Sequence, residues 1–95
     1  MRSLSKNRKN KSGRYHGLWE FYHPDGKIKS KGLYNNGLKE GYWEYYYSNG
    51  NLICKGLYLN GGEEGIWEYY YANGKLVKKE LYENGNLIEV YEEFK

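Results

Sequence analysis

The chain has 95 residues, of which 19% are aromatic, and its formal net charge at pH 7 is +3. A chain of this length forms one small domain that buries about 60% of its unfolded surface, and here its 13 tyrosines must supply much of that area. No apolar run reaches the roughly 18 residues of a membrane span. A single cysteine, Cys54, excludes an internal disulfide framework, and residues 1–13 lack the apolar core of a secretory signal. We therefore expect a cytoplasmic protein.

The first segment, residues 1–16, is predicted to be a flexible basic arm. It contains six of the fifteen Lys and Arg residues and no acidic residue. A segment this polar buries too little apolar surface to offset the entropy that folding costs. The other 79 residues carry nine basic and twelve acidic groups, a net charge of −3, so the basic character of the chain belongs to the arm.

The second segment, residues 17–95, is predicted to be a repeat domain. Residues 17–40, 41–64 and 65–88 are copies of one 24-residue unit without insertion or deletion, and residues 89–95 are a partial fourth copy. Each unit has two β-prone segments, such as residues 43–47 and 52–58. Asn-Gly and Asp-Gly pairs separate them and favour the positive φ of tight turns. We predict an all-β antiparallel meander of about seven short strands over residues 15–94. The expected turns lie at Gly26, Gly37, Gly50, Gly61, Gly74 and Gly85.

In one-letter code, GYWEYY at 41–46, NG at 49–50, GLY at 56–58 and NG at 60–61 resemble the bacterial variant of the MORN repeat. The resemblance extends over residues 17–94 and implies an elongated, twisted, largely single-layer sheet. It also implies a protein-interaction module; some eukaryotic members are linked to membranes and phosphoinositides, and many bacterial members carry an antitoxin label. Glu80 replaces the glycine of Gly32 and Gly56, and Glu89 replaces the glycine that begins a unit. The third unit is therefore expected to serve also as a cap.

Positions that are identical in every unit are expected to build the fold, because each unit must solve the same packing problem. Trp19, Trp43 and Trp67 are predicted to form the core, with a ligand-stacking platform as the alternative. The other apolar columns are Tyr22, Tyr46, Tyr70, then Leu33, Leu57, Leu81, and then Tyr34, Tyr58, Tyr82. Glycine inside a strand, as at Gly32 and Gly56, marks a close backbone approach or an aromatic ring laid over it. The acids Glu20, Glu44, Glu68 and the bases Lys31, Lys55, Lys79 are expected to pair across strands; alternatively, the acids face a basic partner.

Strand alternation places Trp43 and Tyr45 on one face and Tyr42 and Glu44 on the other, so both faces are aromatic. A single-layer sheet cannot hide both, and an exposed apolar patch usually marks an interaction site. The candidate partner-binding rings are Phe21, Tyr45, Tyr69, His23, Tyr47 and Tyr71. The candidate acids, expected in loops, are Glu40, Glu63 and Glu64. The alternative is that these rings only thicken a thin core.

Groups suited to catalysis are few. His16 and His23 are the only imidazoles, and no CxxC or HxxxH spacing suggests a metal site, so we expect neither an enzyme nor a cofactor. We predict a binding module that docks on a partner protein and inhibits or sequesters it. The alternatives are nucleic-acid binding through the basic arm and aromatic strands, and association of the arm with a membrane surface. Open sheet edges would also allow a homodimer.

Overall fold

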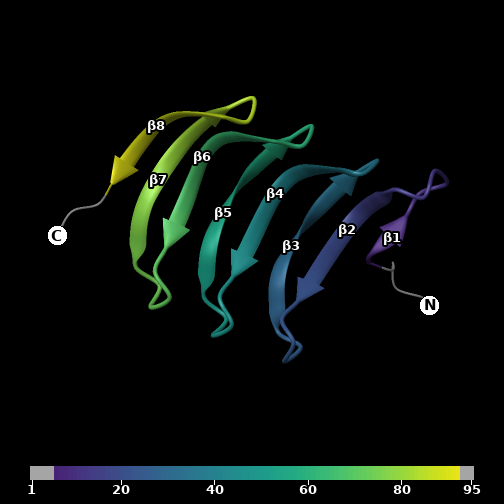
Figure 1. Cartoon of the computed structure of the whole chain (residues 1–95), viewed down its shortest axis with the longest axis horizontal. Coiled ribbons are helices and arrows are strands. Elements are labelled where there is room, and N and C mark those ends of the chain that lie inside the picture. Colours follow the sequence, from purple (N-terminus) through teal and green to yellow (C-terminus); the bar gives the residue numbers. More distant parts are fainter. Residues whose placement is uncertain (1–5, 93–95) are drawn as a thin grey trace.

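The computed structural model describes residues 6–92, and over these residues the fold is one antiparallel sheet without a helix. Eight strands follow one another in chain order, each hydrogen-bonded to the next (Figure 1). The strands are β1 (Arg8–Lys9), β2 (Tyr15–Tyr22), β3 (Ile28–Asn35), β4 (Leu38–Tyr46), β5 (Leu52–Leu59), β6 (Gly62–Tyr70), β7 (Leu76–Glu83) and β8 (Asn86–Glu92). The predicted all-β meander of three tandem repeats is confirmed. It has eight strands instead of about seven because β1 precedes the expected start.

Two kinds of turn alternate along the chain, and all six predicted turn positions are confirmed. The turns between β3 and β4, β5 and β6, and β7 and β8 are Asn-Gly pairs with positive φ at both residues, for example 53° at Asn36 and 88° at Gly37. This geometry is the two-residue hairpin turn that matches the twist of the flanking strands. The other turns are longer; in residues 23–27 the N–H of His23 donates to the carbonyl of Lys27 at 2.8 Å.

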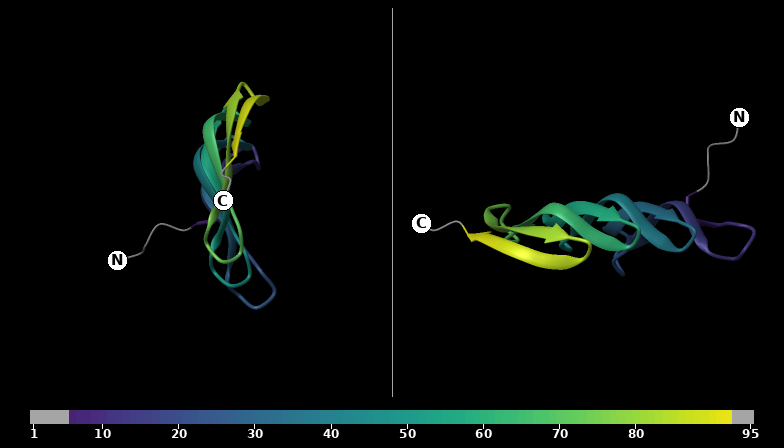
Figure 2. Two further views of the ribbon diagram at one scale, coloured as in Figure 1. Left: turned by 90° about the vertical axis from the view of Figure 1, so that its left-hand side faces the viewer. Right: turned by 90° about the horizontal axis from the view of Figure 1, so that it is seen from above.

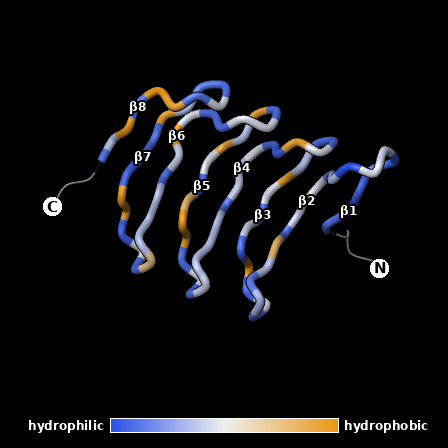
Figure 3. Tube along the Cα trace, viewed as in Figure 1, coloured by the Kyte–Doolittle hydropathy of each residue, from blue (hydrophilic) through white to orange (hydrophobic). Residues whose placement is uncertain are grey.

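The sheet is a single thin layer. Its extents are 50 × 33 × 22 Å, and Figure 2 shows that no second layer covers either face over the described residues. The repeat is visible in Figure 3, where apolar segments recur at matching places along β3, β5 and β7. We call the side with Trp19, Trp43 and Trp67 the Trp face, and the side with Glu20, Glu44 and Glu68 the ladder face. Because there is no second layer, side chains of the sheet itself must build the core.

The indoles of Trp43 and Trp67 each pack on a glycine of the strand that precedes them. The exposed fraction is 1% for Trp43 and 2% for Trp67. The Nε1 of Trp43 donates to the carbonyl of Leu33 at 2.9 Å, and a Cβ added at Gly32 would lie 2.2 Å from Cδ2 of the same indole. Glycine is therefore required beneath the ring. The prediction that the Trp column is the core is confirmed, and an exposed stacking platform is excluded.

A bulge lets the indole reach the neighbouring strand. Lys31 pairs with Glu44 and Leu33 pairs with Glu40, so three residues of β4 stand opposite Gly32 alone. Gly41, the first of the three, has a φ of 75°, which side chains with a Cβ rarely adopt. The extra residues bend the strand.

The two departures in the third unit change its last hairpin. Next to the turn the register of β8 matches that of the other units, but its bulge lies between Leu81 and Tyr82 and adds one residue instead of two. Beyond the bulge, Lys79 therefore pairs with Tyr91, whereas its counterpart Lys31 pairs with Glu44. At the position that Gly32 and Gly56 hold in the first two units, the third unit has Glu80. It is only 7% exposed and accepts hydrogen bonds from Tyr82 and Lys78 at 2.8 and 2.9 Å.

Part of the segment predicted as a flexible arm forms a hairpin with β2. Arg8 pairs with His16 in the register of β1 and β2, and the carbonyl of Arg8 accepts the Nε1 of Trp19 at 2.9 Å. The Nζ of Lys6 lies 2.8 Å from the carboxylate of Glu20. This corrects the expectation for residues 6–14: their backbone pairs with β2, and the polar side chains of Asn7 and Asn10 add hydrogen bonds to the hairpin. The expectation for residues 1–5 lies outside the described residues.

Candidate functional site

Alternating charges cross the ladder face from strand to strand. The register places these side chains in successive pairs: Glu20, Lys31, Glu44, Lys55, Glu68 and Lys79. The Nζ atoms of Lys31 and Lys55 lie 3.8 Å from the carboxylates of Glu44 and Glu68. The predicted cross-strand pairing is confirmed. Pairs at this distance and exposure contribute about a few tenths of a kcal/mol each, so the ladder mainly fixes a balanced charge pattern.

An apolar row runs beside the ladder. Its register pairs are Leu18 with Leu33, Tyr42 with Leu57, and Ile66 with Leu81. Tyr42 is 76% exposed, and Leu18, Leu33 and Ile66 are each between 44% and 49% exposed. The leucine column was predicted to help build the fold, and Leu33 is nevertheless exposed, because the indoles fill the opposite face. A continuous apolar row open to solvent is typical of a protein interaction surface.

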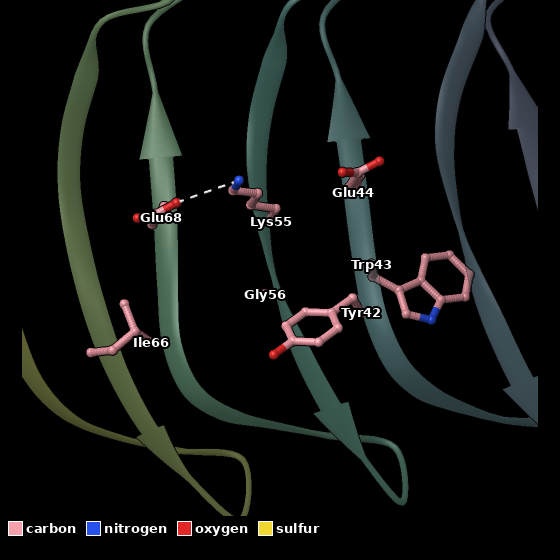
Figure 4. A pocket seen from close by; sticks show the side chains of 7 residues that line it. All are labelled: Tyr42, Trp43, Glu44, Lys55, Gly56, Ile66 and Glu68. Carbon is pink, nitrogen blue, oxygen red and sulfur yellow. Dashed lines mark ion pairs between the residues drawn. The ribbon is translucent and has the colours of Figure 1, made fainter.

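Two hollows lie between the apolar row and the ladder. The first has a volume of about 300 Å³, and its lining includes Tyr42, Lys55, Gly56, Ile66 and Glu68 (Figure 4). The second, of about 350 Å³, is lined by the matching columns one unit earlier, with Gly32 in place of Gly56. Figure 4 shows Tyr42 extending toward Gly56 while Trp43 extends the other way. Each hollow lies on the ladder face, behind a glycine that an indole covers on the Trp face: Trp67 covers Gly56 and Trp43 covers Gly32.

The rings predicted to bind a partner lie on the Trp face, where Phe21, Tyr45 and Tyr69 are half-buried. The ring centroid of Tyr45 is 6.1 Å from that of Trp43. Its hydroxyl shares a 2.9 Å hydrogen bond with that of Tyr58 and accepts the Nζ of Lys39 at 2.8 Å. Burial, reinforced by the Tyr58 hydrogen bond, raises the pKa of Tyr45. These contacts bind Tyr45 into the aromatic layer, which is the arrangement expected if the rings thicken the core.

The neighbouring column joins successive units. The Nε2 of His23 donates to the carbonyl of Tyr46 at 3.0 Å, and the hydroxyl of Tyr47 donates to the carbonyl of Tyr70 at 2.7 Å. The side chain of Tyr71 is 56% exposed. His23 therefore makes the contact that a tyrosine makes in the next unit.

The three candidate acids were expected in loops, and this placement is wrong. Glu40 lies in β4, and Glu63 and Glu64 lie in β6. The carboxylate of Glu40 accepts the backbone N–H of Asn60 at 2.9 Å, and Glu64 accepts that of Asn84 at 3.0 Å. The strands extend this far because the bulge after Glu40 preserves pairing on both sides. In the first unit the Nδ1 of His16 accepts the equivalent N–H, from Asn36, at 3.1 Å.

Sequence reasoning missed this structural use of three residues: His16, Glu40 and Glu64. The available signal was an acceptor twenty residues before each Asn-Gly turn. The backbone N–H of a tight turn needs an acceptor, and this column supplies it from the preceding unit.

The thiol of Cys54 is half-buried on the Trp face, between Tyr45 and Tyr69 in the register. Burial raises the pKa of Cys54 to about 11. Because the thiolate is the nucleophile, iodoacetamide at about pH 8 should alkylate the folded protein at least ~100-fold more slowly than the denatured chain. A mass-spectrometric time course measures both rates. Equal rates would mean that the thiol is open to solvent.

Within residues 6–92, no group of three or more His, Cys, Asp or Glu side chains is placed to hold a metal ion. In the same range, no helix has the length and apolarity to cross a membrane. The ladder face itself presents an apolar row, two hollows and a rim of alternating Glu and Lys side chains.

Comparison with known families agrees with this architecture. The profile of the family described as MORN repeat variant matches residues 15–36, 39–60 and 63–84, each match beginning two residues before a unit as defined above. No curated protein and no solved structure matched the chain significantly. MORN repeats are generally associated with modules that bind proteins or membranes. Because three tandem matches cover more than half of the sequence, the chain belongs to the MORN repeat variant family.

Proposed function

We propose that this chain is a non-enzymatic protein-binding module that docks on a partner protein through the ladder face and restrains or sequesters it. The observation that carries the proposal is the apolar row, in which Tyr42 is 76% exposed beside a hollow of about 300 Å³. On the Trp face, Phe21, Tyr45 and Tyr69 are half-buried. In the row, Tyr42, Leu18, Leu33 and Ile66 are open to solvent.

The chemistry of the ladder face suits a protein ligand. Protein interfaces combine an apolar centre with a polar rim, and the row and ladder lie side by side in this way. Units recur every two strands, which corresponds to about 10 Å along the face. A partner segment that presents apolar side chains at this interval fills both hollows, while Lys55 and Glu68 offer charged groups at the rim. A ring as exposed as Tyr42 is the type of residue that dominates binding energy.

A second candidate ligand is nucleic acid, which the basic hairpin at the start of the sheet favours. Residues 6–14 carry five basic side chains and no acid. The ladder face alternates in sign, so a phosphate backbone meets concentrated positive charge only at one end of the sheet. This distribution favours a protein partner over nucleic acid for the ladder face.

The test compares two double variants that remove similar area from opposite faces. Protein captured from a lysate of the natural host is purified and titrated calorimetrically. Tyr42→Ala with Ile66→Ser should weaken binding at least ~30-fold, as loss of central interface residues does, and should leave the thermal midpoint within a few degrees. Tyr45→Ala with Tyr69→Ala should instead lower the midpoint, because Tyr45 packs on Trp43.

Two results would count against the proposal. If Tyr45→Ala with Tyr69→Ala abolishes binding by a protein that is still folded, the partner docks on the Trp face. If the chain binds a random-sequence oligonucleotide at micromolar concentration, with steep salt dependence that is lost on deleting residues 1–14, nucleic acid is the ligand.

A further inference from the structure

The two ends of the sheet carry opposite charge. Between residues 6 and 16 every charged side chain is basic: Lys6, Arg8, Lys9, Lys11 and Arg14. Between residues 80 and 92 every charged side chain is acidic: Glu80, Glu83, Glu89 and Glu92. The first set surrounds β1 and the second surrounds β8, and these are the two edge strands of the sheet (Figure 1).

Each edge strand places one charge on each face. On β1, Arg8 pairs with His16, and Lys9 pairs with Tyr15, whose ring stacks on Trp19; Lys9 therefore lies on the Trp face and Arg8 on the ladder face. On β8, Glu89 pairs with Leu81 of the apolar row and so lies on the ladder face. Glu92 pairs with Lys78 and lies on the Trp face. The two edges are thus complementary in sign on both faces.

The outer edge of β8 is apolar and open. All its residues are exposed, including Leu87 at 50%, Ile88 at 51% and Val90 at 41%, and Figure 3 shows the apolar stretch in orange. Within residues 6–92 no strand pairs with the outer side of β8 or of β1. Unpaired backbone groups on an apolar edge strand are a template for a further strand.

Strand direction decides which copy of the chain fits this edge. All neighbouring strands are antiparallel, so β1 runs opposite to β8. A second copy that continues the meander therefore presents its β1 beside β8 in the antiparallel sense. Pairing of β8 with the β8 of a second molecule would instead bring Glu89 and Glu92 close to the same glutamates of that molecule. Repulsion between like charges disfavours this arrangement.

We propose that copies of this chain associate head to tail, β8 of one copy pairing antiparallel with β1 of the next. In the register that keeps each face continuous, Arg8 lies opposite Tyr91 and diagonal to Glu89, and Lys9 lies opposite Val90 and diagonal to Glu92. Such a contact uses different surfaces on the two copies and does not close on itself, so it produces open-ended chains of molecules. The contact is one strand wide. It is therefore weak and sensitive to salt. The inference is independent of the ladder face and of the proposed function.

Sedimentation velocity over a concentration series tests the proposal on the 95-residue protein. Association should weaken at least ~10-fold between about 20 mM and about 500 mM NaCl. Arg8→Glu with Lys9→Glu reverses the β1 edge, and Glu89→Lys with Glu92→Lys reverses the β8 edge. Each variant alone should stay monomeric, because its two edges have the same sign. An equimolar mixture of the two should associate as the wild type does.

A matched control separates edge charge from total charge. Lys27→Glu with Lys29→Glu changes the net charge as much as the β1 variant does, at exposed positions away from both edges, and should associate normally. Circular dichroism checks folding. If the lysine variant of β8 does not fold, Glu89→Gln with Glu92→Gln replaces it and should weaken association at least ~10-fold at low salt. Undiminished self-association of the β1 variant, or a wild type that stays monomeric at about 1 mM in low salt, would overturn the proposal.

Discussion

Replacing Trp43 by alanine should lower the free energy of unfolding by about 3–5 kcal/mol, the range observed for truncation of a large core aromatic side chain. Trp43 is 1% exposed and lies in the central unit. Its ring makes edge-to-face contacts with Tyr34 and Tyr58 at centroid distances of 5.1 and 6.2 Å, so the cavity would also disturb both neighbours. Urea denaturation followed by far-ultraviolet circular dichroism measures the loss.

Trp19→Ala is the matched control for Trp43→Ala. Trp19 is 8% exposed, and the strand beside it, β1, is short. The Nε1 of Trp19 donates a hydrogen bond to the carbonyl of Arg8 in that strand. Its truncation should therefore cost less than that of Trp43. A Trp43→Ala variant that unfolds at the wild-type urea midpoint would show that the indole lies outside the core.

Gly56→Ala should destabilise the protein by about 3 kcal/mol, the upper part of the usual range for overpacking a core. The added methyl would lie 2.1 Å from Cδ2 of Trp67. The indole cannot move aside freely, because it is 2% exposed and its Nε1 donates to the carbonyl of Leu57 at 3.1 Å. The urea midpoint of the single variant measures the cost.

The effect of Gly56→Ala on the free energy of unfolding should change sign when the ring of Trp67 is absent. In a Trp67→Ala background, Gly56→Ala should be neutral or should stabilise by up to ~1 kcal/mol, because glycine in a strand interior is less favourable than alanine. A double-mutant cycle therefore isolates the ring-on-glycine contact. If Gly56→Ala costs the same in both backgrounds, the contact with Trp67 is not the reason for glycine at this position.

The repeat period accounts for most of what the sequence predicts correctly. Residues that recur every 24 positions must make the same contact in each unit, so turns, strands, the Trp core and the Glu–Lys pairs follow from comparison of the copies alone. The turn at Gly37 is an example, since the Asn-Gly pair strongly favours the positive φ of a two-residue hairpin turn. The structural contact of His23 is also expected from the repeat, because tyrosine occupies the same position in the other units.

What the period does not reveal is how far a strand extends and which face stays open. Glu40 looks like a loop residue because Gly41 follows it, and only the bulge shows that pairing continues. Tyr42 and Tyr45 lie on opposite faces of the sheet, and the sequence alone does not show which of the two is exposed. Their difference arises because the indole of Trp43 covers Gly32 on one face and leaves a hollow on the other. The pairing of Arg8 with His16 also escapes prediction, because the backbone forms it and no recurring side chain marks it.

The placement of the Trp43 and Trp67 indoles on the glycine of the preceding unit also bears on how such a chain changes its length. The contact joins neighbouring units, as Trp43 does with Gly32 and Trp67 with Gly56. Insertion or loss of a whole 24-residue unit therefore creates or removes complete contacts and leaves no mismatched junction. Duplication of one unit in the gene lengthens the sheet by two strands in a single step, while the altered hairpins at the two ends are inherited unchanged.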